Sequence, residues 1–395
     1  MLEAPFPSDI ASVPGRPEVD VLAYFGDDPT RLYQLKQWLP VLEILDETHP
    51  VGILTRDPET ADLTRELTGL PVLCAPEFDQ MHELLPELDA KVAVYCNNSM
   101  RNFQSLIDSR MLHVHINHGE SDKQSMVSNN AKAYDRVFVA GEAAAQRIER
   151  GLIAFDSTKL VRIGRPQLDL QPEPQIAESE RTTVLYAPTW EGDADYNDYS
   201  SVDAFGEQIV RAVLAQPDVR LVYKPHPKVA TSLTPRIAEG HRLLLDLIAE
   251  AAQADPAAGH TAVVEGDILA LMGRCDAMIT DVSSVGLDWL YLRTDKPILI
   301  TDRHHDADTL RREVPVSRAA DVIDVDSIGS LPDLLADRLA HDEHRIARAA
   351  MRHHYFDDVR VGESTHRFCA EIDALCVLRD ELVGVEPSVE DAVTA

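Results

Sequence analysis

The sequence predicts an α/β protein built from two Rossmann-like, doubly wound domains that face each other across a cleft, with a helical C-terminus. Short apolar runs alternate with amphipathic segments of helical length along most of the 395 residues. Such alternation is typical of parallel sheets with helices on both faces. A chain of this length also exceeds one ordinary hydrophobic core, so two domains of about 150–200 residues are expected.

The first half of the chain carries the first set of alternating segments. The expected strands are Val19–Phe25, Val51–Thr55, Val92–Tyr95, Met111–Ile116 and Arg136–Ala140. The expected helices are Arg31–Leu45, Pro58–Leu67 and Gly141–Arg150. The pattern breaks at Gln171–Glu180, where prolines and glutamates follow no apolar period. We therefore expect a first domain over residues 1–170 and a linker over 171–181.

The alternation resumes after the linker. The expected strands are Thr183–Ala187, Arg220–Lys224, Ala262–Val264, Ala277–Thr280 and Pro297–Ile300. The expected helices are Val202–Leu214, Arg236–Ala252 and Gly286–Leu292. We expect a second domain with terminal helices over residues 182–382 and an acidic, frayed tail over 383–395. Ligands of such folds bind at the carboxyl ends of the strands, here between the domains.

The composition excludes several classes of partner. A formal net charge of −30 repels nucleic acid and anionic lipid headgroups, so phosphate would have to bind at a local site. The five cysteines are scattered and form no C-x-x-C pair, which indicates reduced thiols. We expect neither a signal peptide nor a membrane span, and hence a cytoplasmic protein.

A polar burst, Asn117–Lys123, follows the expected strand Met111–Ile116. A histidine at the end of a buried strand, His118, is placed to act as a general base. Gly119 after it allows a close backbone turn. The alternative is a loop histidine before a helix capped by Ser121 or Asp122.

The second candidate is Lys224-Pro225-His226-Pro227-Lys228, directly after another expected strand. The prolines stiffen the turn that aims His226, and the lysines form a compact basic spot in an acidic chain. Lysine charge and a histidine hydrogen bond suit a diphosphate whose leaving group gains charge. The alternative is a purely structural turn.

The third candidate is the stretch Thr280–Gly286, where a strand runs into a helix. Ser283 or Ser284 can cap that helix, and its free backbone N–H groups would then bind an anion. Ordinary capping explains serines here equally well. We expect the stretch Asp302–Asp306 to be a solvated loop, and we expect no metal and no cofactor. No G-x-G-x-x-G follows the first strand, and G-x-S-x-G, H-E-x-x-H and P-loop motifs are absent from the sequence.

Taken in order, these segments resemble the CDP-glycerol glycerophosphotransferase family of teichoic-acid and capsule synthesis. The matching stretches are His118-Gly119, Tyr186-Ala187-Pro188-Thr189-Trp190, Lys224-Pro225-His226-Pro227, Asp281-Val282-Ser283-Ser284-Val285, Gly164-Arg165-Pro166 with Asp169, Lys296-Pro297-Ile298, and Tyr355-Phe356-Asp357 with Gly362-Glu363-Ser364. The resemblance covers roughly residues 90–370 and implies a GT-B-like fold. It also implies that His118 is the base on the acceptor hydroxyl and that His226 contacts the donor diphosphate.

The resemblance further implies a CDP-glycerol or related CDP-alditol donor, a lipid-linked or polymer acceptor, and release of CMP. Members of the family work at the membrane face, so any peripheral association with the inner face of the cell membrane is expected to come through the acceptor or a partner. The expected donor-side residues are Lys224, Thr189, Asp281, Ser283 and Ser284, and the expected acceptor-side residues are Gly119, Glu120 and Lys123. Three positions depart from the family pattern: Glu120–Lys123 replaces Thr-Pro and lysines, Val282 replaces Tyr, and Glu191 replaces Arg. The alternatives are a GT-B glycosyltransferase or epimerase that uses a UDP-sugar, or an inactive envelope-assembly partner.

Overall fold

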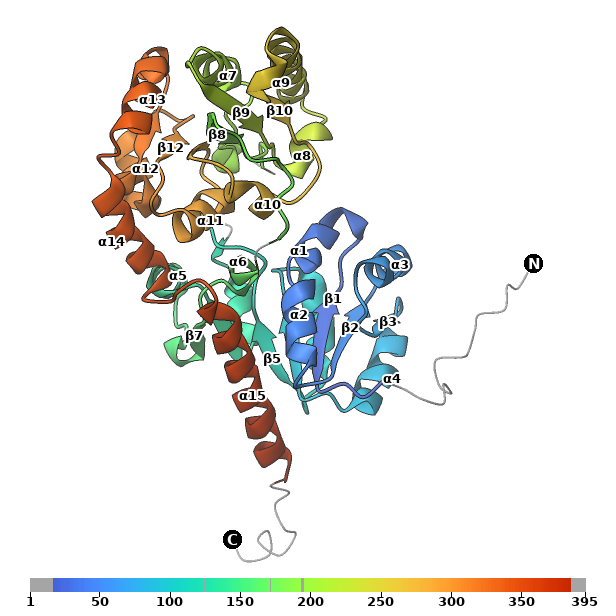
Figure 1. Ribbon diagram of the computed structural model, residues 1–395. Coiled ribbons are helices and arrows are strands. Elements are labelled where there is room, and N and C mark those ends of the chain that lie inside the picture. Colours follow the sequence, from blue (N-terminus) through green and yellow to red (C-terminus); the bar gives the residue numbers. More distant parts are fainter. Residues whose placement is uncertain (1–16, 124–125, 171, 193–194, 385–395) are drawn as a thin grey trace, which may run out of the picture.

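The computed structural model describes residues 17–123, 126–170, 172–192 and 195–384. Two parallel sheets lie in separate lobes, and helices cover both (Figure 1). The α/β architecture with a helical C-terminus predicted from the sequence is therefore confirmed. The acidic tail from residue 385 onward lies outside the described residues. Among the residues described, no helix has both the length and the apolar content needed to cross a membrane.

The first sheet has seven strands in the order β3-β2-β1-β4-β5-β6-β7, and neighbouring strands run parallel. Its strands are β1 (Val21–Phe25), β2 (Val51–Thr55), β3 (Val72–Cys74), β4 (Val92–Tyr95), β5 (Leu112–His115), β6 (Arg136–Val139) and β7 (Leu160–Arg162). Its helices are α1 (Leu32–Lys36), α2 (Leu39–Asp46), α3 (Pro58–Leu67), α4 (Phe78–Leu88), α5 (Glu142–Gly151) and α6 (Pro166–Asp169), with 3-10 turns η2 (Pro29–Arg31), η3 (Met100–Ile107), η5 (Asn129–Ala133) and η6 (Ser157–Lys159).

The second sheet has six parallel strands in the order β10-β9-β8-β11-β12-β13. Its strands are β8 (Thr182–Ala187), β9 (Val219–Tyr223), β10 (Thr261–Ala262), β11 (Ala277–Thr280), β12 (Ile298–Thr301) and β13 (Asp321–Ile323). The helices in this half of the chain are α7 (Gly206–Leu214), α8 (Pro227–Ala230), α9 (Pro235–Ala254), α10 (Leu269–Met272), α11 (Ser284–Leu292), α12 (Ala307–Glu313), α13 (Leu331–Ala340), α14 (Arg345–Phe356) and α15 (Glu363–Gly384), with 3-10 turns η7 (Asp195–Asn197), η8 (Pro256–Ala258), η9 (Pro315–Ala319) and η10 (Ile328–Ser330).

In each sheet the strand order reverses beside the first strand, between β1 and β4 and between β8 and β11. Open α/β sheets bind ligands at the carboxyl ends of strands next to such a reversal. Asp27 and Asn97 follow β1 and β4, whereas Thr189 and Asp281 follow β8 and β11. The topology thus places polar residues from both halves of the chain at the edges where a ligand would bind.

One expected helix is broken. The apolar pattern over Arg31–Leu45 forms α1 and α2 instead of a continuous helix, because Pro40 lies at the start of α2. Proline has no N–H to donate to the carbonyl of Lys36, and its ring disfavours a helical residue before it. The break leaves Trp38 at the junction of the two helices, with its side chain buried.

The expected second domain, residues 182–382, differs from the structure at its end. Helix α15 returns to the first domain and runs alongside it (Figure 1). Phe368, Ile372 and Cys376 join the first-domain core, and the Phe368 and Trp38 rings lie 5.1 Å apart. These residues repeat at a spacing of four and so form one apolar stripe on the helix. The stripe packs against the core of the first domain, although the position of α15 in the sequence predicted the second.

Asp169 holds the start of α15 against the first domain. Its carboxylate accepts the backbone N–H groups of Gly362 at 2.6 Å and Thr365 at 2.7 Å. Such N–H groups at a helix start lack partners within the helix, so the carboxylate caps them. Ser364 Oγ accepts the backbone N–H of Arg165 at 3.0 Å. Two stretches noted in the sequence, Gly164–Asp169 and Gly362–Ser364, thus join the last helix to the first domain.

Candidate functional site

The loop that follows β5 begins with Asn117, whose backbone is left-handed (φ 51°). The indole N–H of Trp38 donates to the Asn117 carbonyl at 2.5 Å. The Asn117 side chain accepts the backbone N–H of His118 at 2.9 Å. Asparagine tolerates this backbone region because its short side chain bonds locally. These contacts turn the chain sharply after the strand and fix where His118 points.

His118 reaches the cleft with an unused ring nitrogen. Its Nδ1 is buried and has no hydrogen-bond partner among the described residues. Burial, and then the nearby charge of Arg165, lower the pKa of His118 to about 4. A neutral imidazole at pH 7 can accept a proton, as a general base must.

The residues after His118 touch the second domain. A side chain on Gly119 would place its Cβ 3.5 Å from the Cβ of Ser284, so these two predicted site residues face each other. Lys123 Nζ lies 3.5 Å from Thr189 Oγ1. The structure therefore brings Gly119 and Lys123, expected on the acceptor side, next to Ser284 and Thr189, expected on the donor side.

Glu120 contacts the first domain, whereas Gly119 and Lys123 lie beside the second. It is buried, and both Glu120 and Asp122 bind the guanidinium of Arg147, at 2.5 and 2.7 Å. Asp122 also accepts the hydroxyl of Tyr355 from α14. Burial raises the pKa of Asp122 to about 6 despite the Arg147 charge. Glu120 thus braces the loop against α5, and its predicted contact with an acceptor remains a prediction.

His226 is oriented by backbone groups on both sides. Its N–H donates to the Pro188 carbonyl at 3.0 Å, and its Nδ1 accepts the N–H of Lys228 at 3.2 Å. A neutral ring whose Nδ1 accepts must carry its proton on Nε2. Burial and the charges of Lys123 and Lys228 lower the pKa of His226 to about 3. His226 therefore presents a neutral N–H donor, which suits a phosphate oxygen.

The two lysines beside His226 have different surroundings. Lys224 is buried, and its ammonium donates to the carbonyls of Val264 at 3.1 Å and Pro225 at 3.4 Å. Burial lowers the pKa of Lys224. Lys228 Nζ lies 3.7 Å from the centre of the Trp190 ring, a cation–π contact. Lys224 thus braces the loop after β10, and contact with donor phosphate remains a prediction for it.

The start of α11 has the features of an anion site. Ser283 is the N-cap residue, but its side chain makes no capping bond and its Oγ is buried without a partner among the described residues. The first N–H groups of this nine-residue helix also lack partners within the helix. A hydroxyl with no partner among the described residues, beside N–H groups that lack partners within the helix, suits a phosphate at the positive end of a helix.

Asp281 supports this region from behind. Its carboxylate accepts the backbone N–H of Thr189 at 2.7 Å, that of Ser201 at 3.1 Å and the Thr301 hydroxyl at 2.7 Å. It is buried, and burial raises its pKa to about 6. Asp281 therefore joins the loops after β8 and before α7 to β12. The structure gives this predicted donor-binding residue a positioning contact with Thr189.

The rings of His118 and His226 both lie next to Tyr33, a residue among the first ninety, where the sequence showed no motif. The ring of Tyr33, on α1, lies 6.0 Å from the His118 ring and 6.2 Å from the His226 ring. The His226 ring also stacks on Trp190 at 6.1 Å. The structure thus brings together the two histidines from different domains, as their positions after expected strands predicted.

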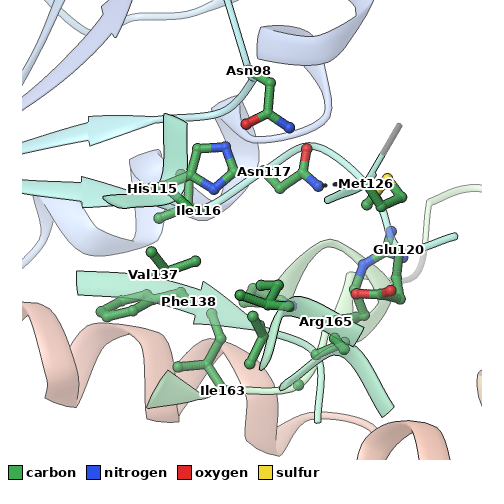
Figure 2. Close-up of a pocket in the computed structure, with 18 of the residues that line it drawn as sticks. Asn98, His115, Ile116, Asn117, Glu120, Met126, Val137, Phe138, Ile163 and Arg165 are labelled. Carbon is green, nitrogen blue, oxygen red and sulfur yellow. Dashed lines mark hydrogen bonds between the residues drawn. The ribbon is translucent and has the colours of Figure 1, made fainter. Parts of the chain in front are cut away.

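A small cavity lies under the His118 loop, inside the first domain. Its volume is about 40 Å³, enough for ordered water but not for a nucleotide. Figure 2 shows the apolar side chains of Val137, Phe138 and Ile163 on one side, facing polar groups. The labelled polar residues are Asn98, His115, Asn117, Glu120 and Arg165. This cavity is therefore too small to be the nucleotide site.

Arg165 and Asp288 form a buried ion pair at 2.9 Å across the two domains. The aspartate pKa is raised to about 6 by burial, which the Arg165 charge opposes. Sequence reasoning noted Arg165 in a motif without a role and missed Asp288, Tyr33 and Trp38. Tyr33 and Trp38 could not be recognised from the sequence, because the residues that they contact are distant from them in the sequence.

Glu191, which departs from the family pattern, contacts a neighbouring loop of the second domain. Glu191 accepts the Ser232 hydroxyl, and its second oxygen is buried without a partner among the described residues. The residues grouped closely enough to hold a metal, within the described ranges, are Asp321, Glu343 and His344. Arg338 donates to both of these carboxylates, which makes the group an ion-pair network.

A sequence model of the family described as CDP-glycerol:poly(glycerophosphate) glycerophosphotransferase matches residues 108–314. That range contains the candidate residues from His118 to Ser284. No curated protein sequence matches the chain.

Solved structures share the fold at low sequence identity. A Listeria monocytogenes structure described as a UDP-N-acetylglucosamine 2-epimerase has a TM-score of 0.59 at 15% identity, covering 92% of this chain and 98% of its own. The wall teichoic acid polymerase TagF gives 0.54 at 15%, covering 92% and 90%. MnaA of S. aureus in complex with UDP gives 0.56 at 13%, covering 91% and 97%. Likeness at this identity shows the fold alone, which is that of GT-B enzymes.

Proposed function

The chain belongs to the CDP-glycerol:poly(glycerophosphate) glycerophosphotransferase family, and we propose that it moves an alditol-phosphate, glycerol-phosphate foremost, from a CDP-activated donor to an acceptor hydroxyl. The acceptor is a lipid-linked or polymeric glycan of the cell envelope or capsule, and CMP is released. One observation carries the proposal: two neutral histidines from different domains lie against the same tyrosine ring, and the residue after His118 faces the N-terminal turn of α11.

The reaction needs one bond made and one broken. The acceptor oxygen attacks the β-phosphorus of the donor, and the bond from that phosphorus to the oxygen shared with CMP breaks. His118 takes the acceptor proton, for which its neutral ring is suited. His226 donates through Nε2 to the diphosphate, and this bond strengthens as the leaving CMP gains charge.

The phosphate oxygens have further donors in the second domain. The Ser283 hydroxyl and the first N–H groups of α11 are placed to bind them, together with the side chain of Thr189. Lys123 and Lys228 supply positive charge near His226. Asp281 acts through Thr189 by fixing its backbone. This arrangement positions and neutralises the donor, which is what phosphoryl transfer requires.

The donor nucleotide is tested by assaying CMP release from CDP-activated donors and UDP release from UDP-sugars, with and without acceptor lipid extracts. CDP is also expected to raise the melting temperature more than UDP does. A ligand at about 100 times its dissociation constant adds roughly 2.7 kcal/mol to the native state. A larger shift with UDP, together with UDP-sugar turnover, would favour the glycosyltransferase or epimerase activity instead.

The pH dependence of kcat/KM follows from the lowered histidine pKa values. A general base works when it is unprotonated, so activity persists above its pKa and is lost as pH falls through it. With pKa values of about 4 for His118 and about 3 for His226, protonation of the histidines is expected to leave kcat/KM level from pH 7 to about 5. The buried carboxyl groups of Asp122, Asp281 and Asp288, with pKa values of about 6, do protonate in this range. The measurement is a pH profile at low donor concentration, within the range where circular dichroism is unchanged, for the parent and for Asp281→Asn. An acid limb near pH 6.5 that persists in Asp281→Asn would mean that the base is solvated like a free histidine.

A further inference from the structure

The ring of Tyr33 contacts both His118 and His226, and Tyr33 lies outside the residues that match the family. The Tyr33 ring is nearly perpendicular to both imidazoles, with interplanar angles of 88° to His118 and 86° to His226. It is half-buried and lies on α1, close to the carboxyl ends of the first sheet. The ring therefore packs against both the candidate base and the histidine of the candidate donor site.

A buried polar network fixes the position of α1. The Gln34 side chain donates to the Tyr33 hydroxyl at 3.3 Å and accepts from Asn97 at 3.0 Å. Asn97 also donates to Asp27 at 3.0 Å. Asp27, Gln34 and Asn97 are all buried. Fully bonded buried networks hold one geometry, so the ring is anchored where the strand order reverses.

Trp38, five residues after Tyr33, contacts the loop that carries His118. Trp38 follows α1 and donates its indole N–H to Asn117, the residue before His118. One short stretch of chain thus places an aromatic ring against both imidazoles and fixes the turn that carries one of them.

We propose that Tyr33 is a positioning residue that keeps water from the donor β-phosphorus, so that the acceptor hydroxyl is the nucleophile. This inference rests on the proposed function. In transfer, the acceptor oxygen bonds to phosphorus, CMP leaves with the electron pair of the broken bond, and the proton goes to His118. In hydrolysis, a water oxygen makes that bond instead, which gives the free alditol phosphate and CMP. Both reactions break the same bond, so the group that reaches phosphorus decides the product.

The test measures how CMP release divides between the two products. CDP-glycerol is supplied with an oligo(glycerol phosphate) acceptor, and free glycerol phosphate is measured beside extended acceptor. Tyr33→Ala is expected to raise the hydrolysed fraction about tenfold while the dissociation constant for CDP changes less than about threefold. Tyr33→Phe keeps the ring and is expected to divide its products as the parent does.

Phe78→Ala is the matched control. Its ring lies 6.0 Å from the ring of His82 on α4, a similar contact away from the site, and its loss is expected to leave the division unchanged. If Tyr33→Ala hydrolyses no larger fraction than the parent, the proposal is overturned. If the parent itself releases CMP from no CDP donor, the proposed function fails instead.

A second readout does not depend on the donor. Removal of the ring admits water to both imidazoles, so the pKa values of His118 and His226, followed by NMR in the free protein, are expected to rise towards 6.5 in Tyr33→Ala. In Tyr33→Phe they are expected to stay low. Unchanged pKa values in a folded Tyr33→Ala protein, checked by its melting temperature, would also overturn the shielding role.

Discussion

His118→Ala is expected to lower turnover by about 100- to 10,000-fold while the dissociation constant for CDP stays within about threefold of the parent. A general base acts on the acceptor proton as the new bond forms, so its loss is felt in the transition state. The His118 ring faces Tyr33 and comes from the first domain, whereas the unused donors for phosphate lie in the second. Donor binding therefore does not require it.

His226→Ala is expected to give a different pattern. Its Nε2–H is directed by the Lys228 backbone bond whether or not the reaction proceeds, so it contacts the donor at rest as well. The variant is expected to bind CDP more weakly and to turn over more slowly. Calorimetry with CDP and steady-state CMP release measure both quantities.

His353→Ala serves as the control for both variants, because this histidine is 63% exposed and pairs with Asp358 away from the cleft. Loss of CDP binding in His118→Ala with normal binding in His226→Ala would reverse the two roles. Turnover at the parent level in both variants would place the active site elsewhere.

The parts of the site that the sequence predicted share one property. His118, His226 and Ser283 each follow a buried apolar run directly, so the strand pattern alone places them at the carboxyl edge of a sheet. Their convergence then follows from the rule that such edges face the cleft. Polar residues that directly follow strands can be predicted in this way because local sequence determines where the strand ends.

Other parts depend on contacts between distant segments. Tyr33 lies between two histidines that follow it by 85 and 193 positions in the printed sequence. Nothing in the pattern around Tyr33 indicates this, because a partly buried aromatic on a helix is ordinary. The same limit misplaced α15, whose apolar stripe fits any sheet face and finds its partner only in three dimensions.

A third group was found in the right place but with different contacts. Asp281 and Lys224 lie at strand ends as expected, yet their polar atoms bond to backbone groups of neighbouring loops. Sequence spacing gives the position of a polar side chain and not its partner. Buried charged groups must be bonded, and here loop backbones supply the bonds.

Gly164→Ala is expected to destabilise the protein by about 2–4 kcal/mol, because two costs add at this position. Its backbone is left-handed (φ 79°), which costs a residue with a side chain roughly 1 kcal/mol. A Cβ would also overlap Ser364 Oγ and lie 3.0 Å from Val359 Cγ1, and overpacking of this kind costs about 1–3 kcal/mol. The melting temperature of the 395-residue chain should fall by roughly 2–5 °C.

The position matters because Ser364 starts α15 and accepts the N–H of Arg165, whose side chain pairs with Asp288. Gly69→Ala is the matched control, since a Cβ there meets nothing within 4 Å and its backbone is not left-handed. Ser364→Ala in the Gly164→Ala background removes the overlapping oxygen, so the double variant should lose less stability than the two single losses combined. Additive losses, or a Gly164→Ala protein as stable as Gly69→Ala, would show that the last helix is not held against the first domain at this point.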